Sequence, residues 1–449
     1  MLENIVNAVR QAGVIGAGGG GFPTHIKLQA KADTVIANGS ECEPLLATDK
    51  TFLKQKARLV VEGLHLAMEA TGAKQGFIAI KGHNKDVVDG VESCLEQYHL
   101  TIAPSHHRTK LALLDNYYPA GDEFMLVYDV TGRVMPEGGL PLNVGVVVNN
   151  VITLAQVAEA AGGKPVTRRY VTITGEVKKP CVVSAPIGAT YADLVAIAGG
   201  TKTDEICLID GGPMMGRLVD NWGDGIAKTT SGILVLPADH FIVQMKKRTI
   251  SQEMKRSRSA CCQCFRCTDL CPRHNLGHEL YPHMTMRTID YNLSEPSGHI
   301  TSAFLCSQCG MCEMVACDIM GLSPRRIFAE YRKQLVSKGI KNPHTRKGFD
   351  ARESYKNTKV SISTVLKKMG LAEYAVKPEF LGDAEVKSVK IPLSRHTGAP
   401  ASACVKCGDK VRMCDVVAVP QDGKLGAAYH ASIAGTITDV DQKWVGIKG

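Results

Sequence analysis

The sequence predicts a multidomain protein of the α/β class, in which an α/β domain is followed by helical and β-rich parts. Before residue 165, apolar runs such as GFIAI and VGVVV alternate with helical stretches such as ARLVVEGLHLAMEA, which indicates a largely parallel sheet covered by helices. Between residues 250 and 345, two dense runs of cysteine lie among segments with helical patterns. After residue 386, glycines separate short β runs, as a small β-sandwich requires.

The first domain carries a glycine-rich loop in the stretch GVIGAGGGGFPTH, which includes Gly16, Gly18 and Gly19. Such a loop lets the backbone approach a phosphate or an isoalloxazine ring closely. A plain turn explains a loop of this kind equally well, and the register of a dinucleotide-binding fingerprint is absent. The asparagines of VVVNN could likewise bind a cofactor or simply form a turn, because asparagine is common in the turn after a buried strand. Spacing alone leaves a cofactor site and a structural loop both open.

The two cysteine runs give a more specific signal. CCQCFRCTDLCP has the spacing C-x2-C-x2-C-x3-C followed by proline, which is typical of bacterial ferredoxins with cubane clusters. CSQCGMCEMVACD repeats the first two spacings and ends with x4, and two successive runs of this form argue against structural zinc. In such pairs the fourth cysteine of each run binds the other cluster. We therefore predict one [4Fe–4S] cluster on Cys261, Cys264, Cys267 and Cys317, and a second on Cys306, Cys309, Cys312 and Cys271.

The last segment holds three further cysteines. The stretches HTGAPASACVKCGDKVRMCDVVAV and GKLGAAYHASIAGTITDV look like two halves of a lipoyl-like barrel-sandwich. Cys404 and Cys407 form a C-x-x-C pair that can open and close a disulfide, and neighbouring lysines would favour the thiolate. Two alternatives stay open: packing as small apolar groups, for Cys414 especially, and a zinc site completed by His396 or His430.

The composition narrows the class of protein. With 449 residues, 44% of them hydrophobic, the chain is long enough for roughly three globular domains. The net charge of +9 comes from basic residues that are spread out, apart from MKKRTISQEMKRSRSA and SPRRIFAEYRKQ. These two stretches favour solvated helix faces or a docking surface for an acidic redox partner over nucleic-acid binding. No signal peptide and no run of about 18 apolar residues is found, so we expect a cytoplasmic protein without membrane insertion.

Several motifs occur in an order that resembles a known family. GAGGGGFPTHIKL, ANGSECEP, YPAGDE and VVVNNVIT follow one another as in the NADH- and FMN-binding subunit of respiratory complex I and its relatives. With VTITGEVKKPCVVSAPIGATYADLVAIAGG, DGGPMMG and the two cysteine runs, the likeness covers most of the chain. Together these motifs resemble the RnfC/PduS-like family of flavin and iron–sulfur electron-transfer proteins. The nearest branches are the PduS-type cobalamin reductases and PrdC, which is associated with proline reductase.

The resemblance implies a cofactor site in the first domain. Amide side chains of asparagine can donate and accept hydrogen bonds at once, as a flavin ring requires, and a lysine can neutralise phosphate. Two positions depart from the complex I subunits, with Ser40 in place of an aspartate and Asp122 in place of a glutamate. The implied FMN site consists of Gly16, Gly18, Gly19, Lys27, Asn38, Asn149 and Asn150, and the implied nicotinamide pocket of Phe22, Glu41, Glu43 and Glu123.

The resemblance also implies the domain order. We expect a Rossmann-like FMN- and NADH-binding α/β domain at 1–165 and a β-grasp (SLBB) domain at 166–245, where RRYVTITGEV and TYADLVAIAGG suit a strand and a small helix. A helical ferredoxin-like domain with two clusters follows at 246–345. The polar segment 346–385 is expected to be a linker, and 386–449 a barrel-sandwich module.

These parts predict an NADH-dependent oxidoreductase in which NADH delivers hydride to FMN and two [4Fe–4S] clusters carry single electrons onward. The first acceptor we expect is a disulfide or selenenyl-sulfide of a partner reductase such as proline reductase, with Cys404 and Cys407 as the catalytic relay. One alternative is a corrinoid, reduced as by a cobalamin reductase of a propanediol-type microcompartment. Another is an RnfC-like relay subunit of a membrane complex. Whether the chain forms a homo-oligomer stays open.

Overall fold

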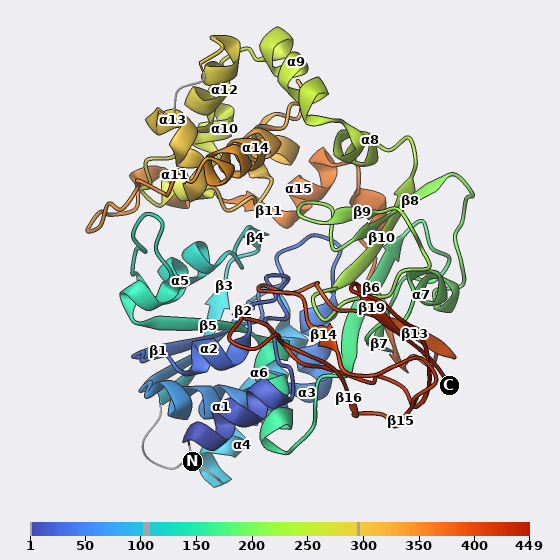
Figure 1. The fold of residues 1–449 in the computed structure, drawn as a ribbon. Coiled ribbons are helices and arrows are strands. Elements are labelled where there is room, and N and C mark those ends of the chain that lie inside the picture. Colours follow the sequence, from blue (N-terminus) through green and yellow to red (C-terminus); the bar gives the residue numbers. More distant parts are fainter. Residues whose placement is uncertain (1, 102–107, 294–296) are drawn as a thin grey trace.

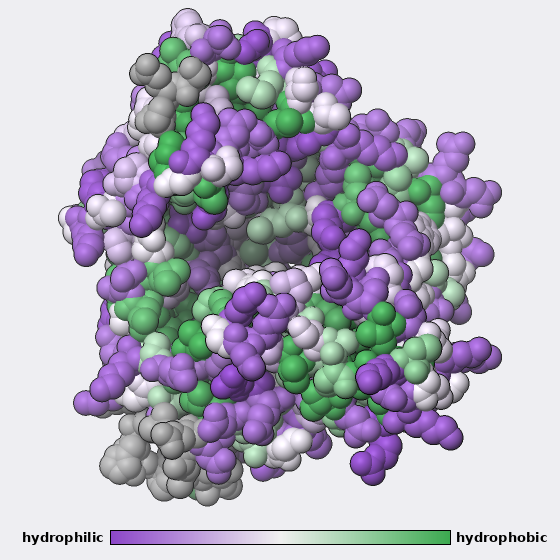
Figure 2. All heavy atoms as spheres, in the orientation of Figure 1, coloured by the Kyte–Doolittle hydropathy of each residue, from purple (hydrophilic) through white to green (hydrophobic). Residues whose placement is uncertain are grey.

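The computed structural model describes residues 2–101, 108–293 and 297–449. Figure 1 shows the cluster-bearing helices stacked above the first domain, with the β-grasp sheet and the C-terminal module beside that domain. The face seen there is hollowed between the helical part above and the other parts below (Figure 2). In the described part of the chain, no helix combines the length and the apolar character needed to cross a bilayer.

The first domain is built on a four-stranded sheet in the order β3-β2-β1-β5 whose pairings are all parallel, as predicted. Its strands are β1 (Thr34–Asn38), β2 (Gln75–Lys81), β3 (Arg108–Leu114) and β5 (Val146–Asn150). The helices are α1 (Leu2–Gln11), α2 (Thr24–Leu28), α3 (Thr48–Thr71), α4 (Lys85–Thr101), α5 (Glu123–Thr131) and α6 (Val151–Ala161), with a short 3-10 helix at Pro141–Val144. Apolar side chains of α1, α3, α4 and α6 cover one face of the sheet and those of α5 the other.

Helices α3 and α6 pack very closely. A Cβ atom added to Gly63 of α3 would lie 1.8 Å from the carbonyl oxygen of Leu154 in α6, so only glycine fits there. Asn150 caps α6, because its Oδ1 accepts a hydrogen bond of 2.9 Å from the backbone N–H of Ile152. The carboxyl end of β5 is thereby fixed against the start of α6.

The β-grasp domain has a mixed sheet in the order β12-β7-β6-β10-β8-β9. Its strands are β6 (Arg168–Gly175), β7 (Cys181–Pro186), β8 (Ile206–Asp210), β9 (Arg217–Val219), β10 (Gly232–Pro237) and β12 (Glu379–Asp383), and α7 (Tyr191–Ile197) packs on them. Strand β6 runs antiparallel to β7 and parallel to β10. This mixed arrangement around one helix agrees with the predicted β-grasp class.

The segment 346–385, expected to be a linker, instead has regular structure. It contains β11 (Val360–Ser361), α15 (Ile362–Lys368), β12 and 3-10 turns at Glu353–Lys356 and Ala372–Tyr374. Strand β11 pairs with β4 (Tyr117–Tyr118) of the first domain, and β12 pairs with β7 of the β-grasp sheet. Phe380 of β12 stacks on Tyr170 with ring centroids 5.3 Å apart. Buried apolar side chains at helical spacing, Val365, Leu366 and Met369, are concealed by the polar average of the segment and explain the difference.

Short helices make up the cluster domain, as predicted. They are α8 (Phe241–Lys247), α9 (Ile250–Ala260), α10 (Arg266–Asp269), α11 (Pro272–Asn275), α12 (Pro282–Asp290), α13 (Gly298–Thr301) and α14 (Pro324–Ser337), with a 3-10 turn at Ser302–Leu305 and a π-helical turn at Cys312–Ala316.

Two small antiparallel sheets form the C-terminal module. One contains β13 (Ser388–Pro392), β15 (Lys410–Val411), β18 (Gly435–Val440) and β19 (Trp444–Lys448), and the other β14 (Ser402–Ala403), β16 (Val416–Val419) and β17 (Tyr429–His430). Their buried side chains, such as Ile391, Val417 and Ile447, belong to the same apolar core as the first domain. The module is therefore firmly docked on the first domain.

Candidate functional site

The glycine loop connects α1 to α2 and presents open backbone. It is closed by hydrogen bonds from the N–H of Gly16 to the carbonyl of Phe22 (2.9 Å) and from the N–H of Gly21 to the carbonyl of Gly16 (3.1 Å). A Cβ atom added to Gly19 or Gly20 would meet no atom within 4 Å. The tip of the loop is thus free for close approach by a ligand, as a phosphate or a flavin ring requires.

The predicted asparagines lie at the carboxyl edge of the parallel sheet. Asn38 ends β1 and Asn150 ends β5, and the two residues are register partners. Asn38 donates to the carbonyl of Gly121 (3.0 Å), and Asn150 donates to Asp49 Oδ2 (2.8 Å). The amide nitrogen of Asn149 is buried and has no hydrogen-bond partner among the described residues. An unpaired buried donor is costly, so it indicates a missing acceptor.

Lys27 of α2 extends toward the same edge of the sheet. Its Nζ lies 3.2 Å from Glu123 Oε1 at the start of α5 and 2.9 Å from the carbonyl oxygen of Val148. The structure therefore brings together the glycine loop, the asparagines, Lys27 and Glu123, with the half-buried Phe22 at the end of the loop. An open backbone cradle, one cation and an unpaired amide donor fit FMN, whose phosphate and ring carbonyls supply the matching acceptors.

Glu41 and Glu43 both accept hydrogen bonds from backbone N–H groups, and their contact with a nicotinamide stays a prediction. Glu41 accepts hydrogen bonds from the backbone N–H groups of Asp49 (2.9 Å) and Lys50 (3.2 Å) at the start of α3. Glu43 Oε1 accepts from the N–H groups of Met214 (2.6 Å) and Met215 (2.9 Å) in the β-grasp loop between β8 and β9. Burial raises the pKa of both carboxyl groups. In this structure their carboxylates hold backbone in place.

The cysteines gather around two cavities in the predicted sets. The four cysteines of each set line a cavity of their own, so the fourth cysteine of each run has joined the other run. In the described part of the chain no three Cys, His, Asp or Glu side chains converge on a single ion. In a cubane each of the four cysteines would bind a different iron. The outer site is Cys261, Cys264, Cys267 and Cys317, and the inner site is Cys271, Cys306, Cys309 and Cys312.

The inner site adjoins the first domain. The hydroxyl of Tyr118 donates to the carbonyl of Cys309 (2.6 Å). The guanidinium of Arg273 covers the ring of Phe124 at 3.1 Å and lies 3.6 Å from Asp122, which caps the helix that begins with Glu123. Sequence reasoning missed Tyr118 and Arg273 as links, although Tyr118 opens the motif YPAGDE.

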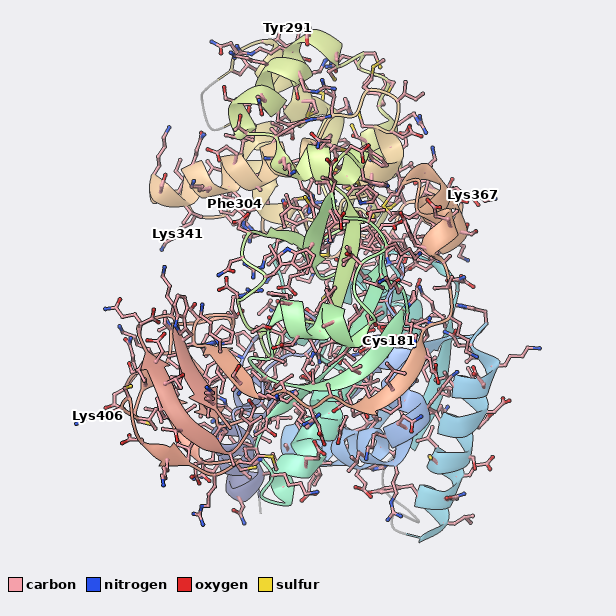
Figure 3. The ribbon with its side chains drawn as sticks, turned by 90° about the vertical axis from the view of Figure 1, so that its right-hand side faces the viewer. Cys181, Tyr291, Phe304, Lys341, Lys367 and Lys406 are labelled. Carbon is pink, nitrogen blue, oxygen red and sulfur yellow. The ribbon has the colours of Figure 1, made fainter. Side chains whose placement is uncertain are left out.

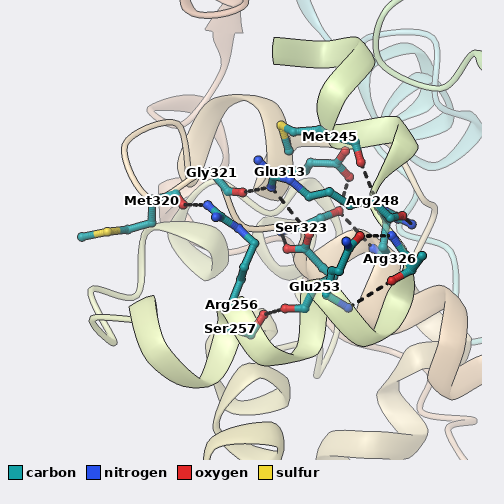
Figure 4. A network of polar contacts seen from close by, with 12 residues as sticks. Met245, Arg248, Glu253, Arg256, Ser257, Glu313, Met320, Gly321, Ser323 and Arg326 are labelled. Atoms are coloured by element: carbon teal, nitrogen blue, oxygen red, sulfur yellow. Dashed lines mark hydrogen bonds and ion pairs between the residues drawn. The ribbon is translucent and has the colours of Figure 1, made fainter. Parts of the chain in front are cut away.

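A buried acid network supports the loop that carries the last cysteine of the outer site (Figure 4). Glu313 is 1% exposed and accepts hydrogen bonds from Arg325 Nε (2.7 Å) and Ser323 Oγ (2.6 Å). Glu253 accepts from the backbone N–H of Ser323 (2.6 Å), and Arg248 Nη1 donates to the carbonyl of Gly321 (2.7 Å). These contacts fix residues 321–323 from three sides.

The C-terminal cysteines lie apart from both cavities. Cys404, Cys407 and Cys414 are exposed, whereas packing would bury them. The thiol of Cys404 donates to the carbonyl of Val416 (3.5 Å), and burial raises its pKa, which is opposite to the expected activation. Figure 3 places Lys406, between the pair, at the outer edge of the module and far from Phe304 of the cluster domain. A catalytic role for Cys404 and Cys407 stays a prediction.

The C-terminal module also touches the glycine loop, which sequence reasoning did not find. Thr397 Oγ1 donates to the carbonyl of Gly20 (2.6 Å), and the N–H of Thr397 donates to the carbonyl of Gly21 (2.9 Å). Arg395 Nη2 forms an ion pair with Asp210 at the end of β8 (2.5 Å). The loop is therefore supported on its outer side by residues of a different module.

Four family models match the chain in the order of the domains. They are the Nuo51 FMN-binding domain at residues 9–159, the SLBB domain at 170–218, the 4Fe-4S dicluster domain at 260–322 and the RnfC barrel sandwich hybrid domain at 382–447. With the cradle and the cysteine sites, these matches define a flavin- and iron–sulfur-dependent oxidoreductase.

Known relatives identify the family. A cobalamin reductase PduS of Salmonella typhimurium is 38% identical over 448 residues, which cover 98% of this chain and 95% of that protein. A component of the Na+-translocating ferredoxin:NAD+ oxidoreductase complex of Acetobacterium woodii is 34% identical over 278 residues, 61% of this chain and 58% of its own length. The chain belongs to the RnfC/PduS-like family of flavin and iron–sulfur electron-transfer proteins.

A solved structure shares the fold at low identity. The NAD+-reducing [NiFe]-hydrogenase in its H2-reduced state has a chain that aligns with a TM-score of 0.51 and 20% identity. The alignment covers 77% of this chain and 64% of the hydrogenase chain. The two chains therefore have the same arrangement of domains over the aligned part.

Proposed function

We propose that this protein is an NADH-dependent reductase of a corrinoid, which uses FMN and two [4Fe–4S] clusters. The observation that carries the proposal is the match to a cobalamin reductase along 98% of the chain, against 61% for the component of the ion-translocating complex. The relatives favour this alternative over a partner such as proline reductase, which was the first expectation from the sequence.

The residues of the cradle supply binding and orientation. Bound FMN would accept the two electrons of a hydride from NADH and release them singly, as iron–sulfur clusters require. Gly19 and Gly20 leave room for close approach, Lys27 supplies a positive charge, and the free amide of Asn149 supplies a donor. In this proposal Phe22 and Glu123 line the nicotinamide side.

Glu41 and Glu43 act in this proposal as positioning residues. Glu41 fixes the start of α3, and Glu43 ties the segment after β1 to the β-grasp loop at Met214. The same loop reaches the inner site, because a Cβ atom added to Gly310 would lie 3.5 Å from the carbonyl of Met214. Glu43 thus connects the flavin side of the protein to the cluster side.

The two cysteine sites follow each other in space. The inner site adjoins α5 through Tyr118 and Arg273. Burial and nearby thiols, among them Cys267 of the outer site, raise the pKa of Cys312, so the two sites are neighbours. The outer site is closest to solvent, because Cys264 is exposed. This order supports electron flow from the cradle through the inner site to the outer site.

The test uses the purified holoprotein with FMN and clusters, kept free of oxygen. NADH should bleach the visible absorbance of the clusters, and added aquocobalamin should then be reduced while the absorbance of the clusters returns. A variant Cys271→Ser should keep NADH oxidation by a small quinone, because the cradle is intact, and lose most of the corrinoid reduction.

Two results would overturn this proposal. If NADH does not bleach the clusters, the electron path is wrong. If bleaching occurs and corrinoid is not reduced, the acceptor is wrong. In that case, mass-spectrometric mapping of the alkylation of Cys404 and Cys407 before and after NADH tests the dithiol prediction directly, since reduction would open a disulfide to labelling.

A further inference from the structure

We propose that the surface around the outer site is a docking face for an acidic electron-transfer protein, an inference that rests on the proposed function and names its immediate partner. The face is defined by the exposed apolar residues Phe265, Ile319 and Met320 together with the cations of α9. It differs from the cradle, which lies on the other side of the inner site.

The centre of this docking face is apolar and exposed. Ile319 is 81% exposed, Phe265 46% and Met320 37%. All three line the cavity that Cys264 and Cys317 also line. Apolar side chains grouped beside a redox centre resemble the core of a protein–protein interface, which excludes water when a partner covers it.

Cations of α9 lie to one side of the apolar centre. Lys255, Arg256 and Arg258 are exposed on α9, and Arg256 Nη2 donates to the carbonyl of Met320 (3.4 Å). Figure 4 shows the side chain of Met320 pointing away from the buried acid network, opposite to its carbonyl. In the described part of the chain, neither Lys255 nor Arg256 forms an ion pair. Their charge therefore stays available to a partner.

The carboxylate of Asp318, beside the apolar centre, is neutralised within the chain. Arg266 Nη1 lies 3.3 Å from Asp318 Oδ1, and Lys368 forms an ion pair with the other oxygen. Two cations against one anion leave this side of the face positive. Positive charge beside an apolar centre complements an acidic partner and speeds its encounter.

The docking face is also preformed. The buried acid network holds residues 321–323, which directly follow Met320. A surface that is ordered before binding loses little conformational entropy when a partner docks. The short path from Cys264 to solvent lets a docked protein approach the outer site closely.

The test compares two electron acceptors of opposite charge, acidic cytochrome b5 and basic cytochrome c, with NADH and the holoprotein. Cytochrome b5 should be reduced faster at low salt, and its rate should fall as salt is added, because screening weakens the attraction. The double variant Lys255→Glu/Arg256→Glu should slow the reduction of cytochrome b5 by about tenfold or more and speed that of cytochrome c.

A matched control variant, Lys31→Glu/Lys74→Glu, reverses the charge of two exposed lysines in the first domain. It should reduce cytochrome b5 and cytochrome c at rates within about twofold of those of the wild type. Menadione, a small neutral acceptor, should be reduced equally by all three proteins. If the wild-type protein does not reduce menadione with NADH, the proposed function itself is refuted. Normal menadione reduction with unchanged cytochrome rates in the α9 variant, or equal effects in both variants, would refute the docking face alone.

Discussion

The ion pair between Glu313 and Arg325 should be the most sensitive support of the cluster domain. The two side chains are 1% and 14% exposed, and Arg325 contacts Glu313 through Nε at 2.7 Å and Nη2 at 3.3 Å. Burial acts to lower the pKa of Arg325, yet Glu313 raises it above its usual value. Glu313 is therefore the main anionic partner of this guanidinium.

The substitution Glu313→Gln keeps the shape of the side chain and removes the charge. Unit charges about 4 Å apart at an effective dielectric of about 20 attract each other by about 4 kcal/mol. Removal of one partner of a buried pair costs about 3–5 kcal/mol, because the other charge stays buried and unpaired. For a domain of about 60–100 residues, 1 kcal/mol corresponds to about 4–8 °C, so the melting temperature should fall by at least about 12 °C.

The assay is anaerobic thermal melting of the holoprotein, followed by the visible absorbance of its clusters. The double variant Glu313→Gln/Arg325→Gln removes both charges and should melt above Glu313→Gln, because no uncompensated cation is left. A fall of about 4–8 °C or less for Glu313→Gln would show that no more than a neutral hydrogen bond of about 1 kcal/mol was lost. A double variant that melts below the single variant would refute the charge argument.

Three further predictions concern other parts of the molecule. Cys317→Ser should give the same residual electron paramagnetic resonance spectrum as Cys264→Ser, because both serve the outer site, whereas a spectrum like that of Cys306→Ser would show that each run keeps its own cluster. Burial lowers the pKa of Lys228 from 10.5 to about 7. Between about pH 7 and pH 10.5 the unfolded chain therefore binds more protons than the folded chain. The free energy of unfolding should rise with pH across that range. Lys228→Met should flatten this rise in chemical unfolding experiments, and an unchanged slope would contradict it. Gly21 has φ +61°, and a Cβ atom added there would lie 3.0 Å from the backbone of the C-terminal module. Gly21→Ala should therefore weaken FMN binding by about tenfold in a flavin fluorescence titration. An unchanged affinity for FMN would contradict the idea that the module supports the loop.

The sequence predicted those features that depend on local patterns. Alternating apolar runs predicted the parallel sheet, and the cysteine spacing predicted that Cys271 and Cys317 exchange sites, since the spacing limits where the chain can reach. The order of several motifs predicted the family. These signals need no knowledge of contacts between distant segments.

Features that depend on distant contacts could not be predicted. The carboxylate of Glu43 meets backbone N–H groups at Met214, and Thr397 meets Gly20, although no local pattern announces either contact. Strand β12 joins the β-grasp sheet from a segment whose average composition is polar. Backbone donors have no sequence signature, because every residue except proline has one. A nicotinamide contact for Glu43 stays a prediction for this reason.

The contact between Thr397 and the glycine loop affects when the protein can acquire its flavin. These two segments are 377 residues apart in the sequence. At about 5–20 residues per second, a ribosome adds Thr397 about 20–75 seconds after Gly20, although the first domain can begin to fold much earlier. Until then the loop lacks its outer support. The newly made chain should therefore hold FMN weakly during synthesis and bind it firmly only once the barrel-sandwich module has docked.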